Sequence, residues 1–528
     1  MVRFARNGDK DAVRGHESNA EKALKNLVTS ILSQLVIFAS GIMIPRLVMV
    51  NLGSESNGLL GTVNQALVYL ALLEGGMGLS VTKALYAPVA NGDNEKLNGI
   101  MAAASGFFMR VGVVYCACVV ALAAIFSLTL RSSLPSATVF AVVVVTAAPQ
   151  AVNFLWVQKY RILIAVYGKS YFLTVLSTLF HLAGSVLKVI FLCSGCGLTE
   201  VQALFCFTQV AEMFFIVRYV RRICPWLKPG AVPRIGALEQ RSAVFMHQIA
   251  GFVFNNTDML LLTYFCGLTY ASVYSVYFML FSALKSIASA FLSSVTFAMG
   301  QKYHTDIKEY LRLHAAAETY SSVVNFSLFF VLNRCAGPFI TIYTAGVSDM
   351  KYADPALTWL FTAVYLMDAV RTPYRKAIEF SGEFRATKHH AFIEAAVNLS
   401  VSLICVSIFG IHGVLIGTVA ALAVRGVLMV HFASRKVLMI SPVGFIFKVA
   451  ANLFVFSLLA VFDTACGMRS GLTSYAAISA YAAAWTMISL LAFTSAACLY
   501  DRDSMAALLK AIKNRRVGND ATTTNDPR

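Results

Sequence analysis

Among the basic residues inside long apolar runs of this sequence, four are candidates for chemistry: Arg46, Lys285, Arg334 and Arg425. A charged side chain in the interior of a bilayer costs about 3 kcal/mol on insertion scales, so such residues usually face a bundle interior or a water-filled cavity. Guanidinium and ammonium groups in a dehydrated site suit contact with phosphate oxygens. We therefore predict that these four line a cavity for a phosphate-bearing ligand. The alternative for Arg46, about one turn from the end of its run, is a side chain that extends to the membrane surface.

Lys285 is the charge whose position is hardest to explain by packing alone. It lies about fifteen residues into its run, too deep to reach either surface with ease. Tyr270, Tyr274, Tyr277 and Phe281 precede it along one helical face. Tyrosines in line with a buried lysine suit a ligand that carries both sugar and phosphate, although aromatic stripes more often belong to the core. On this pattern Tyr274 and Tyr277 are candidate ligand contacts.

A second set of candidates is acidic or amide in character. His247, Gly251, Asn255 and Asp258 follow at spacings of four, four and three residues, which puts them on one face of a helix. Such a stripe is expected of residues that line a cavity. A carboxylate such as Asp258 could bind a proton or Na⁺ in one conformation and release it in another. We therefore name Asp258 and Asn255 as candidates for coupling-ion binding or gating.

A weak internal repeat relates the two halves of the chain. Shifting the second half back by 214 residues brings Arg46 near Asp258 and Glu74 near Lys285, with the signs of charge exchanged. This predicts complementary charges across a central cavity; the alternative is ion pairing within one half. Glu212, in the middle of its run, is a candidate partner for one of the deep cations. Glu74 and Glu212 complete the set of coupling-ion or gating candidates.

These residues must be positioned by helices that cross a membrane. The 528-residue chain is 58% hydrophobic and 13% charged, with a mean hydropathy of +0.69. Its apolar runs reach about 20 residues, the length that a helix needs to cross ~30 Å of hydrocarbon. We predict an all-α integral membrane protein with about fourteen transmembrane helices, in two six-helix pseudo-repeat lobes plus two C-terminal helices. The runs lie near 27–50, 59–81, 108–130, 137–157, 171–193, 198–220, 243–266, 270–298, 320–346, 356–372, 390–410, 412–434, 443–465 and 473–499.

The distribution of lysine and arginine predicts the orientation. With the N-terminus inside, the external connections carry only Arg131, Lys351 and Arg469, and the basic clusters fall in the cytoplasm together with both termini. No apolar signal segment occurs near the start of the sequence. The expected divisions are a cytoplasmic segment 1–25, an N-lobe 26–222, a linker 223–242, a C-lobe 243–434, two further helices in 435–500, and a cytoplasmic tail 501–528.

The motifs of several function classes are missing from the sequence. It contains no GxxxxGK[ST] phosphate loop, no HExxH and no GxSxG, so we expect neither an ATPase nor an enzyme of the usual hydrolytic kinds. The net charge is +17. Most of the lysines and arginines that produce it lie between apolar runs and not in a basic soluble module, so no nucleic-acid partner is expected. The lone "CSGC" pair, Cys193 and Cys196, reads as two ordinary thiols or a local disulfide. We expect no metal and no cofactor beyond a coupling proton or Na⁺.

Two stretches carry a family resemblance. "PRLVMVNLGSESNGLLGTVNQALVYLALLEGGMGLSVTKALY" (45–86) and "NNTDMLLLTYFCGLTYASVYSVY" (255–277) resemble the first-helix and seventh-helix hairpins of Wzx-type polysaccharide and O-antigen flippases. These belong to the multidrug/oligosaccharidyl-lipid/polysaccharide (MOP) exporter superfamily, which also holds the MATE drug exporters and the lipid II flippases. Arg46 and Asp258 match the family pattern by position.

The resemblance implies a function and its setting. It implies two lobes around a central cavity, alternating access, and a location in the bacterial cytoplasmic membrane. The implied substrate is an undecaprenyl-pyrophosphate-linked oligosaccharide, flipped from the inner to the outer leaflet with energy from an ion gradient or the membrane potential. Membrane lipids and the polysaccharide polymerase machinery are the implied partners. The alternatives are a MATE-like proton- or sodium-coupled exporter of small molecules, a membrane-embedded polymerase and a non-transporting scaffold.

Overall fold

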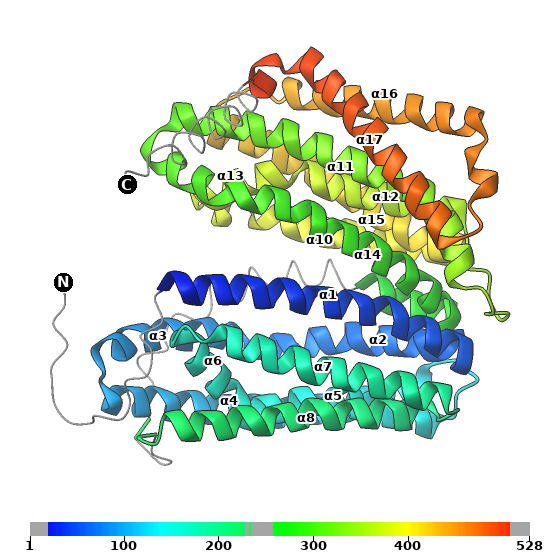
Figure 1. The fold of residues 1–528 in the computed structure, drawn as a ribbon. Coiled ribbons are helices and arrows are strands. Elements are labelled where there is room, and N and C mark those ends of the chain that lie inside the picture. Colours follow the sequence, from blue (N-terminus) through cyan, green and yellow to red (C-terminus); the bar gives the residue numbers. More distant parts are fainter. Residues whose placement is uncertain (1–18, 228–231, 234–256, 507–528) are drawn as a thin grey trace, which may run out of the picture. The chain divides into compact units, whose positions relative to one another are not determined.

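The regular structure of the chain is helical (Figure 1). The computed structural model describes residues 19–227, 232–233 and 257–506, and no strand occurs within these ranges. Eleven helices there are long and apolar enough to cross a membrane, and a bent pair, Ser54–Glu74 with Met77–Asn91, makes a twelfth. The predicted all-α membrane class is confirmed, and the chain is a multi-pass membrane protein.

The remaining two of the fourteen predicted spans are shorter in the described chain. Helix α12 (Pro355–Val370) has 16 residues, fewer than a straight crossing of the hydrocarbon requires. The predicted run 243–266 is described only over the apolar helix Thr257–Cys266. His247, Gly251 and Asn255 lie outside the described residues.

By their internal contacts, the residues divide into two compact units. Unit 1 is Met1–Ile44, Leu70–Ala124 and Phe140–Phe245, and unit 2 is Pro45–Tyr69, Ile125–Val139 and Met246–Arg528. Residues 45–69 and 125–139 thus count with unit 2, although the sequence suggests one continuous N-lobe over 26–222. Most of the expected linker 223–242 is outside the described residues, so that division stays a prediction.

Unit 1 contains two local departures from straight α-helix, each with a cause in the sequence. Pro149 cannot donate a backbone hydrogen bond, and a π-helical turn, η2, follows at Asn153–Val157. Gly75 and Gly76, with φ of 59° and 72°, take left-handed conformations that suit glycine and bend the chain by 45°. The helical segments of unit 1 belong to α1 (Asn19–Leu52), η1 (Leu72–Glu74), α3 (Met77–Asn91), α4 (Asn94–Thr129), α5 (Ser136–Val152), η2, α6 (Gln158–Val166), α7 (Ser170–Cys193) and α8 (Leu198–Ile223).

Unit 2 is built around a close hairpin of two helices. On α15 (Ile411–Phe432), Gly413 and Gly417 approach α14 (Phe384–Phe409) so closely that an added Cβ would lie 2.1 Å from atoms of Cys405 and Ser402. Glycine at these positions therefore sets the contact between the two helices. The other helical segments are α2 (Ser54–Ala71), α10 (Leu268–Thr305), α11 (Ile307–Tyr343), α12, α13 (Thr372–Ser381), η4 (Ala433–Leu438), α16 (Val443–Cys466), η5 (Met468–Gly471) and α17 (Tyr475–Tyr500).

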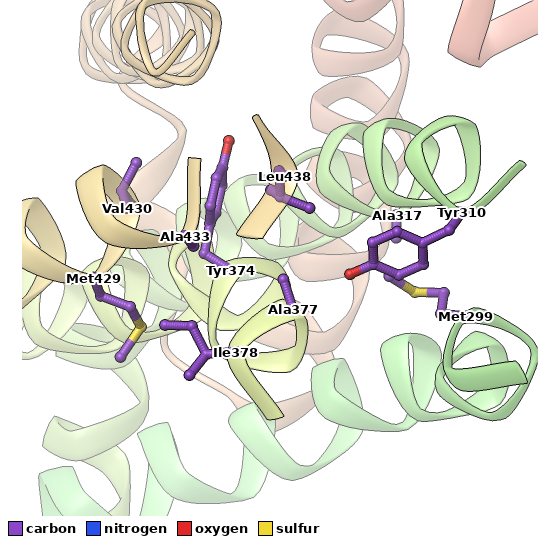
Figure 2. Close-up of a cluster of buried hydrophobic side chains, with 10 residues drawn as sticks. All are labelled: Met299, Tyr310, Ala317, Tyr374, Ala377, Ile378, Met429, Val430, Ala433 and Leu438. Carbon is purple, nitrogen blue, oxygen red and sulfur yellow. The ribbon is translucent and has the colours of Figure 1, made fainter. Parts of the chain in front are cut away.

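One apolar cluster joins α13 to the ends of its neighbours in unit 2 (Figure 2). Figure 2 shows Tyr310 beside Met299 on one side of α13, and Met429 beside Ile378 on the other. Burial of such side chains stabilises the short, otherwise polar helix α13. The cluster comprises Met299, Tyr310, Ala317, Tyr374, Ala377, Ile378, Met429, Val430, Ala433 and Leu438.

Helix α2 begins against α10 through polar contacts and a glycine. The backbone N–H and the hydroxyl of Ser54 donate to the carboxylate of Asp349, at 2.8 and 2.6 Å, which satisfies a free N–H at the helix start. Asn57 donates to Ser272 at 2.8 Å. Gly58 lies so close to α10 that an added Cβ would stand 1.8 Å from the carbonyl oxygen of Leu268.

We predict that Gly58→Ala destabilises unit 2 by about 1–3 kcal/mol, because a backbone carbonyl cannot move aside as a side chain can. Thermal unfolding of the purified protein in detergent measures the effect. Gly337→Ala is the matched control, since nothing lies within 4 Å of a Cβ at that position. An equal or smaller loss for Gly58→Ala than for Gly337→Ala would contradict the predicted contact.

Candidate functional site

Lys285, the deepest cation predicted from the sequence, pairs with a carboxylate of α12. Its Nζ lies 2.6 Å from Asp368, and the two side chains are 41% and 13% exposed. Asp368 also accepts two hydrogen bonds from Arg371, at 2.8 and 3.1 Å, and lies 4.0 Å from Arg375. One buried carboxylate is therefore shared by three cations, of which Lys285 and Arg375 remain partly exposed.

The pairing continues from α12 into the α14–α15 hairpin. Arg371 also donates to Glu394 of α14, at 2.8 Å, and Arg425 of α15 donates to the other oxygen of the same carboxylate. A chain of ion pairs thus runs from Lys285 on α10 to Arg425 on α15. Sharing each carboxylate offsets part of the cost of removing these charges from water.

A cavity of about 600 Å³ opens beside Lys285. Its charged lining is Lys285, Asp368, Arg375 and Lys376, of which Lys376 also pairs with Glu379 at 2.5 Å. The rest of its polar lining consists of small hydroxyl and amide side chains. These are Ser289, Ser293 and Thr296 of α10, Ser321 and Asn325 of α11, and Thr372 of α13. A cationic cavity with many hydroxyl groups can bind an oxyanion together with a polar group attached to it.

Asp258 occupies a different, oxygen-rich position. It is 5% exposed, and its Oδ2 accepts hydrogen bonds from Thr418 at 2.7 Å and from Tyr274 at 3.4 Å. Asn398 donates in turn to the hydroxyl of Thr418, at 2.9 Å. Within the described chain no basic side chain pairs with Asp258, so its neighbours supply oxygen atoms and a hydroxyl proton but no positive charge.

Two of the predicted ligand contacts serve the packing of unit 2. Tyr277 is fully buried; its hydroxyl donates to the carbonyls of Tyr352 and Asp354, at 3.2 and 3.0 Å, and accepts from the backbone N–H of Asp354 at 2.9 Å. Tyr274 contacts Asp258, as above. Neither tyrosine lines the cavity beside Lys285.

Arg334 and Arg46 contact the C-terminal helices. Arg334 on α11 lies 3.6 Å from Asp463 of α16, which is fully buried and also accepts a hydrogen bond from Tyr481 of α17. Arg46 donates to the hydroxyl of Tyr475 at the start of α17, at 3.3 Å. These two cations therefore lie apart from Lys285 and Arg425, since their partners are on α16 and α17.

A second charged cluster joins α16 and α17 to the other end of α11. Lys448 lies 2.9 Å from Glu318 and 2.7 Å from Asp501, and Thr319 donates to Asp501 at 2.5 Å. Burial by itself raises the pKa of the Asp501 carboxyl, but the hydrogen bonds from Lys448 and Thr319 outweigh it and leave the pKa below its ordinary value. The two C-terminal helices are thus attached to α11 by charge near both of its ends.

In unit 1 the predicted acidic residues have local partners. Glu212 is 2% exposed and accepts from Arg161 at 2.8 Å and from Ser177 at 2.7 Å. Glu74 accepts longer hydrogen bonds from neutral groups, namely the side chain of Gln158 at 3.3 Å and the backbone N–H of Gly78 at 3.1 Å. The expected partner of Glu212 was one of the deep cations of the second half; Arg161 takes this place because it faces Glu212 across the contact between α6 and α8.

The sequence does not reveal the importance of Asp368 and Glu394. Both lie near the ends of their predicted runs, where depth alone suggests that nearby polar groups satisfy them. The spacing of Asp368, Arg371 and Arg375 by three and four residues is the available signal, because it puts an acid and two bases on one helical face. Their convergence with Lys285 and Glu394 follows only from the packing of α10, α12 and α14.

The comparisons with known proteins place the fold. No protein-family model and no curated protein matches the chain. Among solved structures, the lipid II flippase MurJ in an inward closed conformation matches with a TM-score of 0.65 and 13% identity, over 91% of this chain and 99% of that one. The chain therefore has a fold similar to that of this flippase.

Two MATE structures support the same assignment of the fold. An inward-facing MATE family transporter of the MOP superfamily gives a TM-score of 0.58 at 14% identity, over 79% of this chain and 98% of the other. The MATE multidrug transporter DinF-BH in complex with R6G gives 0.54 at 13%, over 82% and 100%. These three structures are of two transporters and a flippase, and their shared fold agrees with the expected transporter class. The resemblance to Wzx-type flippases stays a prediction.

We predict that Arg371→Met lowers the free energy of unfolding by about 3 kcal/mol, because Asp368 and Glu394 each lose a buried partner. Unfolding in detergent, followed by circular dichroism, measures the change. Arg312→Met is the control: this side chain is 83% exposed and lies 3.6 Å from Glu309, so its loss should cost less than about 1 kcal/mol. Similar losses for the two variants would contradict the central role of Arg371.

Proposed function

We propose that this chain is a flippase that moves a polyprenyl-pyrophosphate-linked oligosaccharide from the inner to the outer leaflet of a bacterial cytoplasmic membrane. The observation that carries the proposal is the cavity of about 600 Å³ beside Lys285, with Arg375 and Lys376 in its lining. The MOP-type fold supports transport as the class of function. The absence of catalytic motifs from the sequence agrees with it.

The charge of the site suits a pyrophosphate. Five cations (Lys285, Arg371, Arg375, Lys376 and Arg425) and three carboxylates (Asp368, Glu379 and Glu394) are joined by ion pairs, which leaves a net charge of +2. A pyrophosphate diester carries about two negative charges, and cations in a partly dehydrated cavity offset its desolvation. Drug exporters that carry organic cations would be served better by a surplus of carboxylates.

Lys285 is the residue best suited to take part in a binding cycle. It is 41% exposed and shares Asp368 with Arg371, so Asp368 keeps a buried partner when the ammonium group turns to a ligand phosphate. The hydroxyl-bearing side chains of α10 and α11 then face the sugar. The cavity lies toward the helix ends that the distribution of basic residues assigns to the cytoplasm, where such a substrate is loaded.

Asp258 is proposed as the coupling-ion residue. A buried carboxylate with hydroxyl groups against it and, in the described chain, no paired cation is suited to a proton or Na⁺. The α14–α15 hairpin connects this site to the cavity, because Asn398 follows Glu394 by four residues and Arg425 follows Thr418 by seven, each pair on one helical face. Ion binding at Asp258 would thereby bias the position of the hairpin that holds Arg371.

We predict that Lys285→Ala and Arg375→Ala reduce surface-polysaccharide display by about tenfold or more in a deletion strain, because each removes a charge-assisted contact to phosphate. Display and the accumulation of cytoplasmic-side lipid-linked oligosaccharide are measured at equal membrane abundance of each variant. Arg312→Ala, an exposed change on α11, should restore display fully.

Normal display with Lys285→Ala and Arg375→Ala would exclude this cavity as the substrate site. Normal display in the deletion strain itself, with loss of resistance to organic cations, would favour the MATE-like exporter.

We predict that Asp258→Asn abolishes the dependence of transport on an imposed proton or Na⁺ gradient, since the amide keeps the size but not the titratable, cation-binding charge. Uptake of lipid-linked oligosaccharide analogue into the outer leaflet of proteoliposomes, with each gradient applied separately, provides the measurement. Asp306→Asn, a helix-capping aspartate at the start of α11, is the control and should keep the gradient dependence. Retained gradient dependence in Asp258→Asn would rule out this role.

A further inference from the structure

Unit 1 has a cavity of its own, separate in composition from the one beside Lys285. It has a volume of about 570 Å³ and is formed where α4 begins, α8 ends and α6 lies against them. Its polar lining includes Asn98 and Ser105 of α4, Lys159 and Tyr160 of α6, and Arg221 of α8. Residues 224–227, just after α8, complete it.

Among the described residues, the charged side chains that line this cavity are all positive. Lys159 and Arg221 line it, and no described aspartate or glutamate does. Lys159 is half-buried and donates to the hydroxyl of Ser105 at 2.6 Å, and no carboxylate in the described chain forms an ion pair with it. Arg161, two residues along the same helix, shows the contrast, because its guanidinium is neutralised by Glu212 at 2.8 Å.

A half-buried lysine without a carboxylate is costly unless something neutralises it. If position 159 on α6 served only packing, an aliphatic side chain would suffice. If it served only solubility, the lysine would extend into water. Here the ammonium group donates to the hydroxyl of Ser105 in a cavity that the exposed Arg221 also lines. The arrangement supplies several N–H donors to one small volume, which is the requirement for holding an oxyanion.

We propose that this cavity binds a phosphate group, held by Lys159 and Arg221 with Ser105 positioning the lysine. The site is distinct from the proposed substrate cavity, since its described lining residues all belong to unit 1 and none of them lines the other cavity. Its helix ends are those that the distribution of basic residues assigns to the cytoplasm. The phosphate is therefore supplied either by an anionic lipid headgroup of that leaflet or by a soluble phosphate compound.

The first experiment tests phosphate itself on the full chain in neutral detergent. The thermal unfolding midpoint is followed against sodium phosphate, with sodium chloride at equal ionic strength as the reference. Wild type should be stabilised, and Lys159→Gln/Arg221→Gln should lose about tenfold or more in apparent phosphate affinity. Arg222→Gln is the matched control, because it removes the same charge from the next position of α8 without lining the cavity.

The second experiment identifies the source of the phosphate. The same variants are placed in nanodiscs of phosphatidylcholine alone or of equal parts phosphatidylcholine and phosphatidylglycerol, and retained lipid is measured after extraction. Selective retention of phosphatidylglycerol by wild type and Arg222→Gln, but not by the double variant, assigns a lipid headgroup. A response to sodium phosphate without lipid selectivity assigns a soluble phosphate compound.

Further variants keep the outcome interpretable. Lys159→Arg/Arg221→Lys preserves both charges and should preserve the response, so its retention there beside a loss in the glutamine pair, at equal unfolding midpoints without phosphate, assigns the loss to charge. Loss of the response in this charge-preserving pair at an unchanged midpoint would count against the proposal. Lys285→Ala removes a cation of the proposed substrate cavity, which can also bind phosphate, so the part of the response that persists in Lys285→Ala and is lost in Lys159→Gln/Arg221→Gln belongs to the cavity of unit 1. The proposal is overturned if wild type responds to neither phosphate nor phosphatidylglycerol, or if Arg222→Gln loses the response as fully as the double variant.

Discussion

The shared burial of Asp368 and Glu394 is the interaction on which the candidate site depends. Between them these two carboxylates pair with Lys285, Arg371, and Arg425. Charges removed from water at this depth are tolerated only when each has partners in good geometry. The requirement brings α10, α12, α14 and α15 together at one level, and so determines where a cavity with partly exposed cationic groups can form.

Two residues of this network, Glu394 and Arg425, lie on the α14–α15 hairpin. Gly413 and Gly417 let the two helices approach closely, so the pair behaves as one packed element. Asn398 and Thr418 lie on it beside Asp258, and Glu394 and Arg425 lie further along it. The carboxylate site at Asp258 and the ion pairs of Glu394 are therefore built on the same two packed helices, and Arg371 links Glu394 to Asp368 in the cavity lining. Coupling between two ligands would need such a connection between their sites.

In unit 1 the charged side chains are paired differently from those beside the cavity of unit 2. The buried acid Glu212 is satisfied by Arg161 and Ser177, whereas Lys159 donates to a hydroxyl in a cavity that Arg221 also lines. The charges beside the cavity of unit 2 form one extended network, and those described in unit 1 form small local groups. This difference agrees with a substrate cavity in unit 2 and an accessory anion site in unit 1.

The sequence by itself determined the all-α membrane class and the position of nearly every helix. Length and apolarity of a run suffice for this, because a segment in hydrocarbon must satisfy its own backbone hydrogen bonds. The sequence also identified Lys285 and Asp258 as unusual, since depth along a helix can be counted. Only the tertiary structure decided that Lys285 pairs with Asp368 and Arg334 with Asp463. It also decided that the Tyr277 hydroxyl binds the backbone at Tyr352. Depth gives one coordinate of a side chain, whereas a partner also depends on the rotation of each helix and on which helices are neighbours, and these follow from packing across the whole unit.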